Sequence, residues 1–320
     1  MVPLNNQCSK ALPLDFASVR IEQSCNGLFL CRSFHNADDC FIYFVCNPTT
    51  KKLRKFSFSL ESRLYAVNLA YDPLKSVHYK VIAIRRSVGV AREFEINIYS
   101  SKTNSWAVKV VTFTGKKPKF EAFALDHFCN GAIHWNRRAN PWEPWDPWAS
   151  DSVSWYFHVE NECINKMAMP SWNYMAPHES AIESSRYLGE SCGYLHLGVA
   201  YEPPYFHLNI FEMASNYTWF LKFRLDLETV VEAFPEIDLN SEIGNHPMNA
   251  LCVIRSDKDD QVFKLVAVLD WTIAIFHDMN DKTCTKLCDL KPCSRPHRSC
   301  CDPDLDTFPV FQYFETLACV

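Results

Sequence analysis

The sequence repeats one unit: three short apolar strands, a polar turn that holds an asparagine, and a fourth short apolar strand. FIYFV at 41–45 and FHLNIF at 206–211 are two such strands, rich in the aromatic and β-branched residues that favour sheets. Asparagine suits the turns because its side chain bonds to nearby backbone groups and tolerates a positive φ. Successive turn asparagines lie 57, 57, 55 and 64 residues apart. They are Asn47, Asn104, Asn161, Asn216 and Asn280.

A second set of turn residues precedes those strands and opens another strand of the unit. Asn26-Gly27 and Asn130-Gly131 mark it in two units, and Gly193 marks it in a third. Tyr71-Asp72-Pro73 and Asn249-Ala250 occupy similar places in the second and fifth units. Each unit therefore predicts a four-stranded sheet.

Four strands in a repeat of roughly 40–60 residues are typical of a β-propeller blade, because stacked blades bury both faces of each sheet. The segment at 308–320 predicts one more strand set, which could pair with the N-terminal residues and close the ring. We therefore predict an all-β propeller of five to six four-stranded blades. The alternative is a β-sandwich followed by a second β domain. The five units cover 20–57, 64–111, 121–169, 186–225 and 247–290.

The predicted propeller domain covers residues 20–320, and residues 1–19 form an N-terminal segment that can take part in ring closure. One helix is expected, at 225–234, where LDLETVVEAF lies between the fourth and fifth units.

Charge and composition exclude several classes of function. The 32 basic and 37 acidic residues give a net charge of −5, whereas nucleic-acid binding needs a concentrated basic surface, so no nucleic-acid partner is expected. Only 8 of the 320 residues are glycine, and none has the spacing of a phosphate-binding loop. We accordingly predict no cofactor.

Membrane and secreted proteins are also disfavoured. The most apolar stretch, Leu265–Phe276, is interrupted by Asp270 and is too short to cross a bilayer. Residues 1–20 lack the apolar block of a secretory signal. We expect no membrane partner, and we interpret most of the 15 cysteines as reduced, buried thiols of a cytoplasmic or nuclear protein.

The order of several motifs resembles the F-box-associated domain of plant F-box proteins. The series opens with LPLDF at 12–16, SCNGLFLC at 24–31 and YFVCNPTTKKLRKF at 43–56. The resemblance covers nearly the whole chain, 12–318. The later motifs are LAYDP at 69–73, HYKVIAI at 78–84, EINIYSSKTNSW at 95–106, GAIHW at 131–135 and YFETLA at 313–318.

This resemblance implies a kelch-like propeller that captures a target protein and does no chemistry itself. In the family, an N-terminal F-box binds a Skp-type adaptor, and the complete protein is the substrate receptor of an SCF-type ubiquitin ligase. Such a receptor raises the effective concentration of substrate lysines near the ubiquitin-charged enzyme.

The sequence departs from the family at its N-terminus. Residues 1–20 are too short for an F-box and lack its amphipathic helices. The chain is either a fragment or truncated gene product, or an F-box-less relative in which only the binding role survives. A Skp-type adaptor is therefore expected as a partner only if an F-box lies upstream.

Two loops are candidates for binding the substrate protein. Residues 141–148 read PWEPWDPW, with tryptophan at every third position. Proline favours an extended polyproline-like form, whose three-residue turn places the rings on one side, and exposed aromatic stripes anchor partners. The alternative is that these rings fold back and cap the blade. With the comparable loop at 199–205, the predicted partner-binding residues are Trp142, Trp145, Trp148, Tyr201 and Tyr205.

A group of thiols and one imidazole near the C-terminus does not have the ligand spacing of a zinc site. Cys284 and Cys288 are expected on one face of a strand, and we predict no metal. The group comprises Cys284, Cys288, Cys293, His297, Cys300 and Cys301.

The sequence contains no G-x-S-x-G or H-E-x-x-H motif, so we predict that the chain is not an enzyme. Histidines in the strands, such as His134 and His196, alternate with apolar residues and are expected to be hydrogen-bonded structural groups. One alternative is a propeller enzyme acting on carbohydrate, with two carboxylates about 5–9 Å apart near the central channel. Another is an inactive truncated relative.

Overall fold

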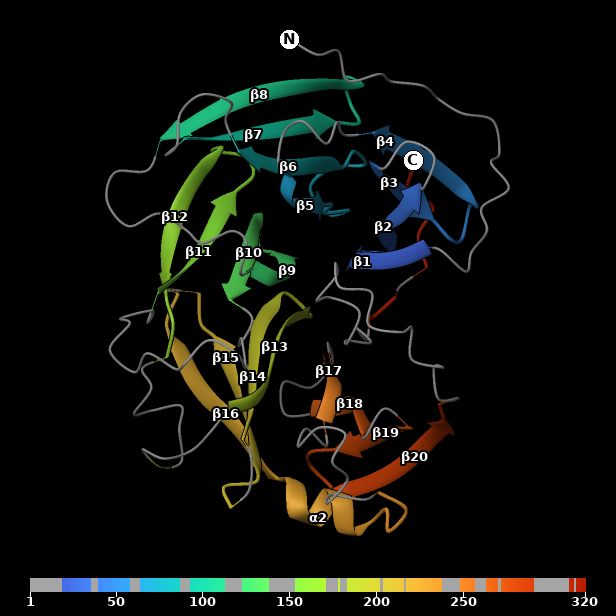
Figure 1. Cartoon of the computed structure of the whole chain (residues 1–320), viewed down its shortest axis with the longest axis vertical. Coiled ribbons are helices and arrows are strands. Elements are labelled where there is room, and N and C mark those ends of the chain that lie inside the picture. Colours follow the sequence, from blue (N-terminus) through green and yellow to red (C-terminus); the bar gives the residue numbers. More distant parts are fainter. Residues whose placement is uncertain are drawn as a thin grey trace. The chain divides into compact units, whose positions relative to one another are not determined.

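The computed structural model contains five four-stranded antiparallel sheets and a short helix in the part of the chain that it describes (Figure 1). In every sheet the strands are hydrogen-bonded in sequence order, so each sheet is an up-and-down meander. The described residues are 19–35, 40–57, 64–86, 93–112, 123–137, 153–170, 178, 183–201, 204–215, 217–237, 248–256, 263–269, 272–290, 311–313 and 315–320.

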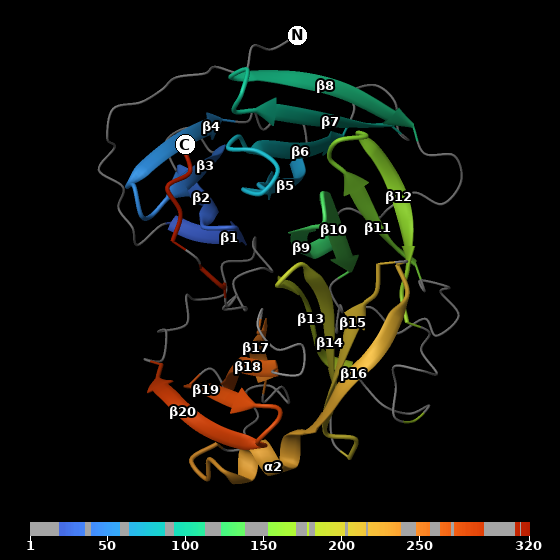
Figure 2. The ribbon, with the colours of Figure 1, turned by 180° about the vertical axis from the view of Figure 1, so that it is seen from behind.

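The first three sheets follow one another along the chain (blue to green in Figures 1 and 2). The first consists of β1 (Val19–Cys25), β2 (Leu28–His35), β3 (Cys40–Asn47) and β4 (Lys52–Ser57). The second consists of β5 (Leu64–Ala70), β6 (Lys80–Arg86), β7 (Glu93–Ser100) and β8 (Ser105–Thr112). The third consists of β9 (Phe123–Cys129), β10 (Ala132–Arg137), β11 (Val153–His158) and β12 (Cys163–Ala168).

The last two sheets flank the helix (yellow to red). The fourth sheet consists of β13 (Glu183–Ser191), β14 (Tyr194–Tyr201), β15 (His207–Met213) and β16 (Trp219–Asp226). Helix α2 (Leu227–Glu232) follows at once, and Asp226 caps it by accepting a hydrogen bond from the Glu228 amide. The fifth sheet consists of β17 (Met248–Arg255), β18 (Phe263–Leu269), β19 (Ile273–Asp278) and β20 (Thr283–Asp289).

These elements confirm the five predicted units, whose bounds agree with the observed sheets to within three residues. The expected helix is also present. The additional strand set at the C-terminus is not: residues 311–313 and 315–320 contain no strand. The described residues therefore form five blade-like sheets rather than six.

Three turns between first and second strands have both central residues in the left-handed region. The φ angles are 47° and 85° at Asn26-Gly27, 51° and 80° at Asn130-Gly131, and 52° and 80° at Cys192-Gly193. Tight hairpins of this kind need two positive φ angles, which Asn-Gly adopts at little cost. The predicted fifth-unit turn at Asn249-Ala250 is wrong, because both residues lie inside β17, next to an irregularity in its pairing with β18.

The chain divides into two compact units, each described here by itself. The first comprises Met1–Trp135, Trp155–Asn165 and Phe311–Val320, and the second comprises Asn136–Ser154 and Lys166–Val310. In the first unit, apolar side chains from β2, β3, β5 and β6 pack together, and a second cluster joins β6 and β7 to β10 and β11. In the second unit, one cluster joins β14, β15 and α2 to β17, β18 and β19.

Buried amides connect neighbouring sheets of the first unit. The side chain of Gln23 on β1 donates to the Leu69 carbonyl on β5 (2.9 Å) and accepts from the Leu69 amide (2.7 Å). Asn68, also on β5, donates to Asp126 on β9 (2.6 Å). Each amide supplies both a donor and an acceptor, so it can satisfy the backbone of a sheet to which its own strand is not paired.

The C-terminal segment lies against the first sheet, where Asn47 holds it. Asn47 is fully buried at the end of β3. Its Nδ2 donates to the carbonyls of Thr316 and Ala318, both at 2.9 Å, and its Oδ1 accepts from the amides of Thr49 and Thr50. One turn asparagine therefore shapes its own turn and ties down residues from the other end of the chain.

We expect Asn47→Asp to release the C-terminal segment. A carboxylate keeps the acceptor for the turn, but it places an oxygen against two carbonyl oxygens, which then lose their donor at about 1–3 kcal/mol each. Hydrogen exchange at the Thr316 and Ala318 amides should become faster. Asn104→Asp is the matched control, because Oδ1 of Asn104 accepts from Arg54 and Tyr99, neither of which belongs to the C-terminal segment. Equal exchange in both variants would contradict this role of Asn47.

Candidate functional site

The aromatic residues predicted to bind a partner differ in their position and in their exposure to solvent. Trp142, Trp145 and Trp148 lie outside the described residues, in the connection between β10 and β11. Tyr201, the last residue of β14, is 0% exposed, which corrects the expectation that it is a surface anchor. Tyr205 is half-buried, and its ring stacks on His178 with centroids 5.2 Å apart and planes 8° apart.

The turn that connects β5 to β6 carries two exposed apolar residues, Leu74 and Val77, that the sequence alone did not point to. Leu74 is 96% exposed and Val77 is 69% exposed. The turn is nevertheless well ordered by hydrogen bonds: the Asp72 carbonyl accepts from the amides of Lys75 and Ser76, and the Asp72 carboxylate accepts from the Leu74 amide. A hydrogen-bonded turn that displays a leucine can offer a contact to a protein partner.

The two described thiols of the C-terminal group do not share a face of their strand. Cys284 pairs with His277 and Cys288 pairs with Ala274, with an irregularity between them at Leu287. Partners three residues apart on β19 point to opposite faces, and Cys284 is half-buried whereas Cys288 is exposed. The expectation of one shared face is therefore wrong. Among the described residues, no three side chains of metal-binding type come together.

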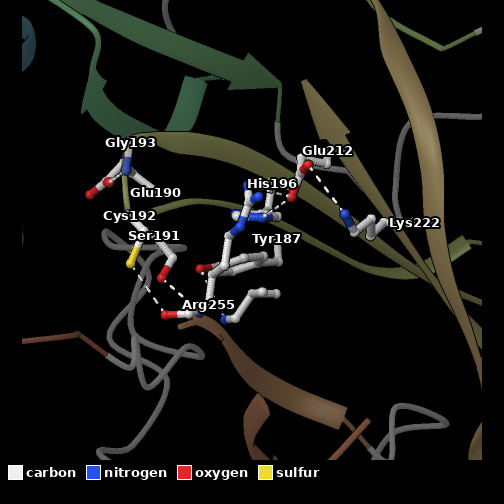
Figure 3. A network of polar contacts seen from close by, with 10 residues as sticks. Tyr187, Glu190, Ser191, Cys192, Gly193, His196, Glu212, Lys222 and Arg255 are labelled. Carbon is white, nitrogen blue, oxygen red and sulfur yellow. Dashed lines mark hydrogen bonds and ion pairs between the residues drawn. The ribbon is translucent and has the colours of Figure 1, made fainter. Parts of the chain in front are cut away.

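A buried polar network joins the fourth and fifth sheets (Figure 3). At its centre is Glu212 on β15, with a side chain that is 4% exposed. One carboxylate oxygen, Oε2, contacts Nε2 of His196 (3.2 Å) and Nη1 of Arg255 (3.1 Å), and the other, Oε1, lies 3.6 Å from Nζ of Lys222. His196 and Lys222 come from the same sheet as Glu212, whereas Arg255 comes from β17.

The charges in this network follow from its surroundings. Burial by itself would raise the pKa of Glu212, but His196, Arg255 and Lys222 together hold that pKa below its usual value. Burial lowers the pKa of His196, and this outweighs the attraction of Glu212. A neutral imidazole must donate its Nε2 hydrogen to an ionised carboxylate. Glu212 therefore carries the negative charge against two cations.

Aromatic rings enclose the cations of the network. The Arg255 guanidinium lies 3.4 Å from the centroid of the Tyr194 ring, and Nζ of Lys222 lies 4.9 Å from that of Phe263. The edge of the His196 ring also meets Phe263. Rings in these positions attract cations through their π faces, so the arrangement stabilises the junction of two sheets.

Strand β13 contributes further contacts across the same junction. The hydroxyl of Ser191 accepts from the Arg255 amide (2.9 Å), and the hydroxyl of Tyr187 accepts from the Val253 amide (3.3 Å). The Tyr187 ring passes over Gly189, where an added Cβ would meet its hydroxyl oxygen at 1.8 Å. Glycine at this position therefore gives the tyrosine its path to β17.

A second polar group lies on the first unit, around Asp126. Its Oδ2 accepts from Asn68, whose Oδ1 accepts from Nε1 of Trp135 (3.0 Å). Oδ1 of Asp126 is buried and has no hydrogen-bond partner among the described residues. Burial raises the pKa of Asp126 to about 7, against the hydrogen bond from Asn68, and the charge of Glu22 adds to the rise.

The raised pKa predicts that Asp126 makes stability depend on pH. An unfolded aspartate has a pKa of about 3.9, so between about pH 4 and pH 7 the folded state holds a proton that the unfolded state has released. The contribution of Asp126 to stability is therefore greatest below pH 4 and is lost as the pH rises to about 7, by at most about 1.4 kcal/mol per pH unit. Asp126→Asn should remove this loss and be more stable than the wild type at pH 8.

Urea unfolding at several pH values measures this effect as a difference between variant and wild type. The difference matters because burial lowers the pKa of His127 and of His134 to about 4. These histidines favour the folded state as the pH rises, which is the opposite trend. Parallel stability curves for the wild type and Asp126→Asn would contradict the raised pKa.

Comparisons with known proteins identify relatives of this chain. A sequence profile of the F-box associated beta propeller domain family matches residues 3–183. F-box protein At5g07610 of Arabidopsis thaliana is 28% identical over 307 residues, which are 90% of this chain and 69% of that protein. F-box protein At5g49610 of the same plant is 33% identical over 140 residues, 39% of this chain and 38% of that protein.

Solved structures give weaker matches. The SapL1 lectin in complex with alpha methyl fucoside is 11% identical, with a TM-score of 0.39 over 84% of this chain and 78% of the lectin. A TM-score this low supports no argument about the fold or the ligand.

Within the described residues, no helix is both long and apolar enough to span a membrane.

Proposed function

Because the chain belongs to the F-box associated β-propeller family, we propose that it is a non-catalytic protein-binding domain that recognises the substrate of an SCF-type ubiquitin ligase. The observation that carries this proposal is the family match, together with the two F-box proteins to which the chain is similar. The fold agrees with such a role, since sheets joined by short turns form a rigid support for binding loops.

The substrate-binding surface that we propose includes the loop with Trp142, Trp145 and Trp148. The turn that displays Leu74 and Val77 extends the candidate surface. Large apolar side chains held on an ordered support are favourable anchors, because little conformational entropy is lost when they bind.

Quantitative mass spectrometry of proteins retained by the immobilised chain from plant extract tests the binding role. A protein retained by the wild type should be lost when all three tryptophans are changed to alanine. The control variant carries Val108→Ala and Val110→Ala, which remove exposed apolar side chains from the outer strand β8. Purified candidates should then bind the wild type with a measurable Kd, and a Kd unchanged by the tryptophan substitutions would exclude that loop as the contact.

The ligase role needs a further partner. We propose that a Skp-type adaptor binds the native protein through an F-box that lies upstream of Met1. This binding would take place in the cytoplasm or the nucleus. The mass of the protein isolated from its source and the 5′ end of its transcript test this directly. A longer chain that co-purifies with the adaptor supports the proposal, whereas a native chain that starts at Met1 and retains no adaptor would leave the binding role alone.

One observation favours the alternative of a carbohydrate-processing enzyme. The negative charge of a second carboxylate, Glu22, contributes to the raised pKa of Asp126. In glycosidases two carboxylates flank the bond that is cleaved. Here Glu22 is already bound to Nε of Arg32 at 2.7 Å, and Asp126 is bound to Asn68. Hydrolysis of aryl glycosides by the wild type, abolished in Asp126→Asn, would replace our proposal with this one.

A further inference from the structure

Two thiols of the first sheet lie close together on neighbouring strands. Cys31 on β2 pairs with Phe44, and Cys46 on β3 pairs with Phe29. The two cysteines are therefore diagonal neighbours on one face of the sheet. Their sulfur atoms are 3.8 Å apart. Closure to a disulfide bond of about 2.05 Å requires the two side chains to turn and the two strands to approach each other at this point, because diagonal neighbours are more widely spaced than directly paired residues.

The two thiols differ in access and in acidity. Cys31 is 3% exposed, whereas Cys46 is half-buried. Either sulfur can donate in the hydrogen bond between them, and when the Cys31 thiol donates, this bond lowers the pKa of Cys46, although burial opposes this. The same hydrogen bond, together with burial, raises the pKa of Cys31. Cys46 is thus the sulfur that small oxidants can reach and the one that more readily becomes the nucleophilic thiolate.

Other described thiols are engaged differently. Cys25 exchanges hydrogen bonds with the backbone of Tyr71, Cys192 donates to the Arg255 carbonyl, and Cys163 accepts from the side chain of Asn165. The bonds of these thiols run to oxygen or nitrogen, whereas Cys46 bonds to the sulfur of Cys31.

We propose that Cys31 and Cys46 form a peroxide-reactive dithiol, in which Cys46 is oxidised first and Cys31 then closes a disulfide. The Cys46 thiolate attacks hydrogen peroxide: a sulfur–oxygen bond forms, the oxygen–oxygen bond breaks, and hydroxide leaves and takes up a proton. The Cys31 sulfur then attacks the Cys46 sulfenic acid, and the Cys31 proton leaves with the hydroxyl group as water. Two thiols and one peroxide thus yield one disulfide and two waters, and a thiol reductant reverses the change.

The position of this pair links its oxidation to the C-terminal segment. Cys46 directly precedes Asn47, which binds the Thr316 and Ala318 carbonyls. Phe29, which pairs with Cys46 across the strands, contacts the Tyr313 ring at a centroid distance of 5.2 Å. The disulfide would therefore form at the end of β3 that binds Thr316 and Ala318.

The test treats the intact protein with hydrogen peroxide, blocks the remaining thiols by alkylation, and maps the peptides by mass spectrometry without reduction. The expected product is a cross-link between tryptic peptides 21–32 and 33–51, with the loss of two hydrogen atoms. Each peptide holds one further cysteine, Cys25 or Cys40, so fragment ions must assign the link. It should disappear on treatment with dithiothreitol.

Three variants separate this mechanism from general thiol oxidation. In Cys31→Ser, Cys46 should stop at the sulfenic acid and be labelled by dimedone, whereas in Cys46→Ser no label should appear at Cys31. Cys163→Ser is the matched control, since Cys163 is also half-buried, and it should form the cross-link as the wild type does. The proposal is overturned if wild-type Cys46 becomes sulfinic acid without a cross-link, if Cys46 links to another cysteine, or if Cys31 is labelled first.

Discussion

Replacing Trp135 with alanine is expected to destabilise the protein by about 3–5 kcal/mol, the range for large aromatic residues removed from a core. Trp135 on β10 is 0% exposed. It packs in the apolar cluster that joins β10 and β11 to β6 and β7. Its Nε1 also donates to Asn68, which in turn binds Asp126. The substitution therefore leaves a cavity and an amide oxygen without its donor.

Two further variants separate these contributions. Trp135→Phe keeps most of the apolar volume but removes the donor, so its cost should be smaller and should come largely from the Asn68 oxygen, at about 1–3 kcal/mol. Trp219→Ala is the matched control, because Trp219 also donates to another residue, the Ala168 carbonyl, but is only half-buried.

The measurement should resolve the two compact units, since they need not unfold together. Hydrogen exchange of the β5 amides and of the β10 amides at 132–135, followed in increasing urea, reports on the first unit alone. Trp135→Ala should lower the protection of these strands far more than Trp219→Ala does. Equal losses of protection in the two variants would show that the Trp135 cluster does not hold these sheets together.

The repeat of strands and turns could be predicted because it depends on local sequence. Alternating apolar residues define each strand, and Asn-Gly at positions 26–27 and 130–131 suits two positive φ angles. The positive φ expected of the other turn asparagines is found only in part. Asn104 has a φ of 53°, but in the corresponding turns of three other units the left-handed residues are Lys51, Glu162 and Lys282.

The role of Asn47 illustrates what the local sequence does not contain. As a turn asparagine it bonds to the next residues of its own turn, which could be expected. Its other hydrogen bonds reach Thr316 and Ala318, more than 260 positions along the chain. A strand was predicted for this C-terminal segment from its apolar residues, yet side-chain bonds from the first sheet satisfy part of its backbone instead.

The buried network could be predicted only in part. His134 and His196 were expected to be hydrogen-bonded structural residues, and they bond to the Cys129 carbonyl and to Glu212. The importance of Glu212 was missed, although a carboxylate at the end of the apolar run FHLNIFEM was a usable signal. Arg255 could not be matched to it, because the partner of a buried charge depends on how the sheets stack.

Removing the Glu212 carboxylate is expected to cost about 3–5 kcal/mol, because the substitution leaves buried cations without their counter-ion. In Glu212→Ala, the Arg255 side chain, 3% exposed, would lose its contact at 3.1 Å. Lys222 is 25% exposed and can turn toward solvent. The loss should therefore come mainly from Arg255, and the protection of β14, β15 and β17 in hydrogen exchange should fall.

A double-mutant cycle assigns this loss to the pair. Arg255→Met by itself should also be costly, because it leaves Glu212 with His196 and Lys222 only, whereas Glu212→Met combined with Arg255→Met should cost less than the two single changes added together. An apolar pair of similar volume avoids the desolvation of both charges. Additive single effects would show that Glu212 and Arg255 contribute independently.

The exposed ion pair of Lys75 and Glu160 provides the control for charge removal as such. Its side chains are 55% and 65% exposed, with nitrogen and oxygen 3.8 Å apart, so Glu160→Ala should change stability by less than about 1 kcal/mol. The contrast with Glu212→Ala isolates burial as the cause. If both variants lost the same small amount, water would have to reach the Glu212 network, and the junction of β15 with β17 would depend on the apolar cluster around it.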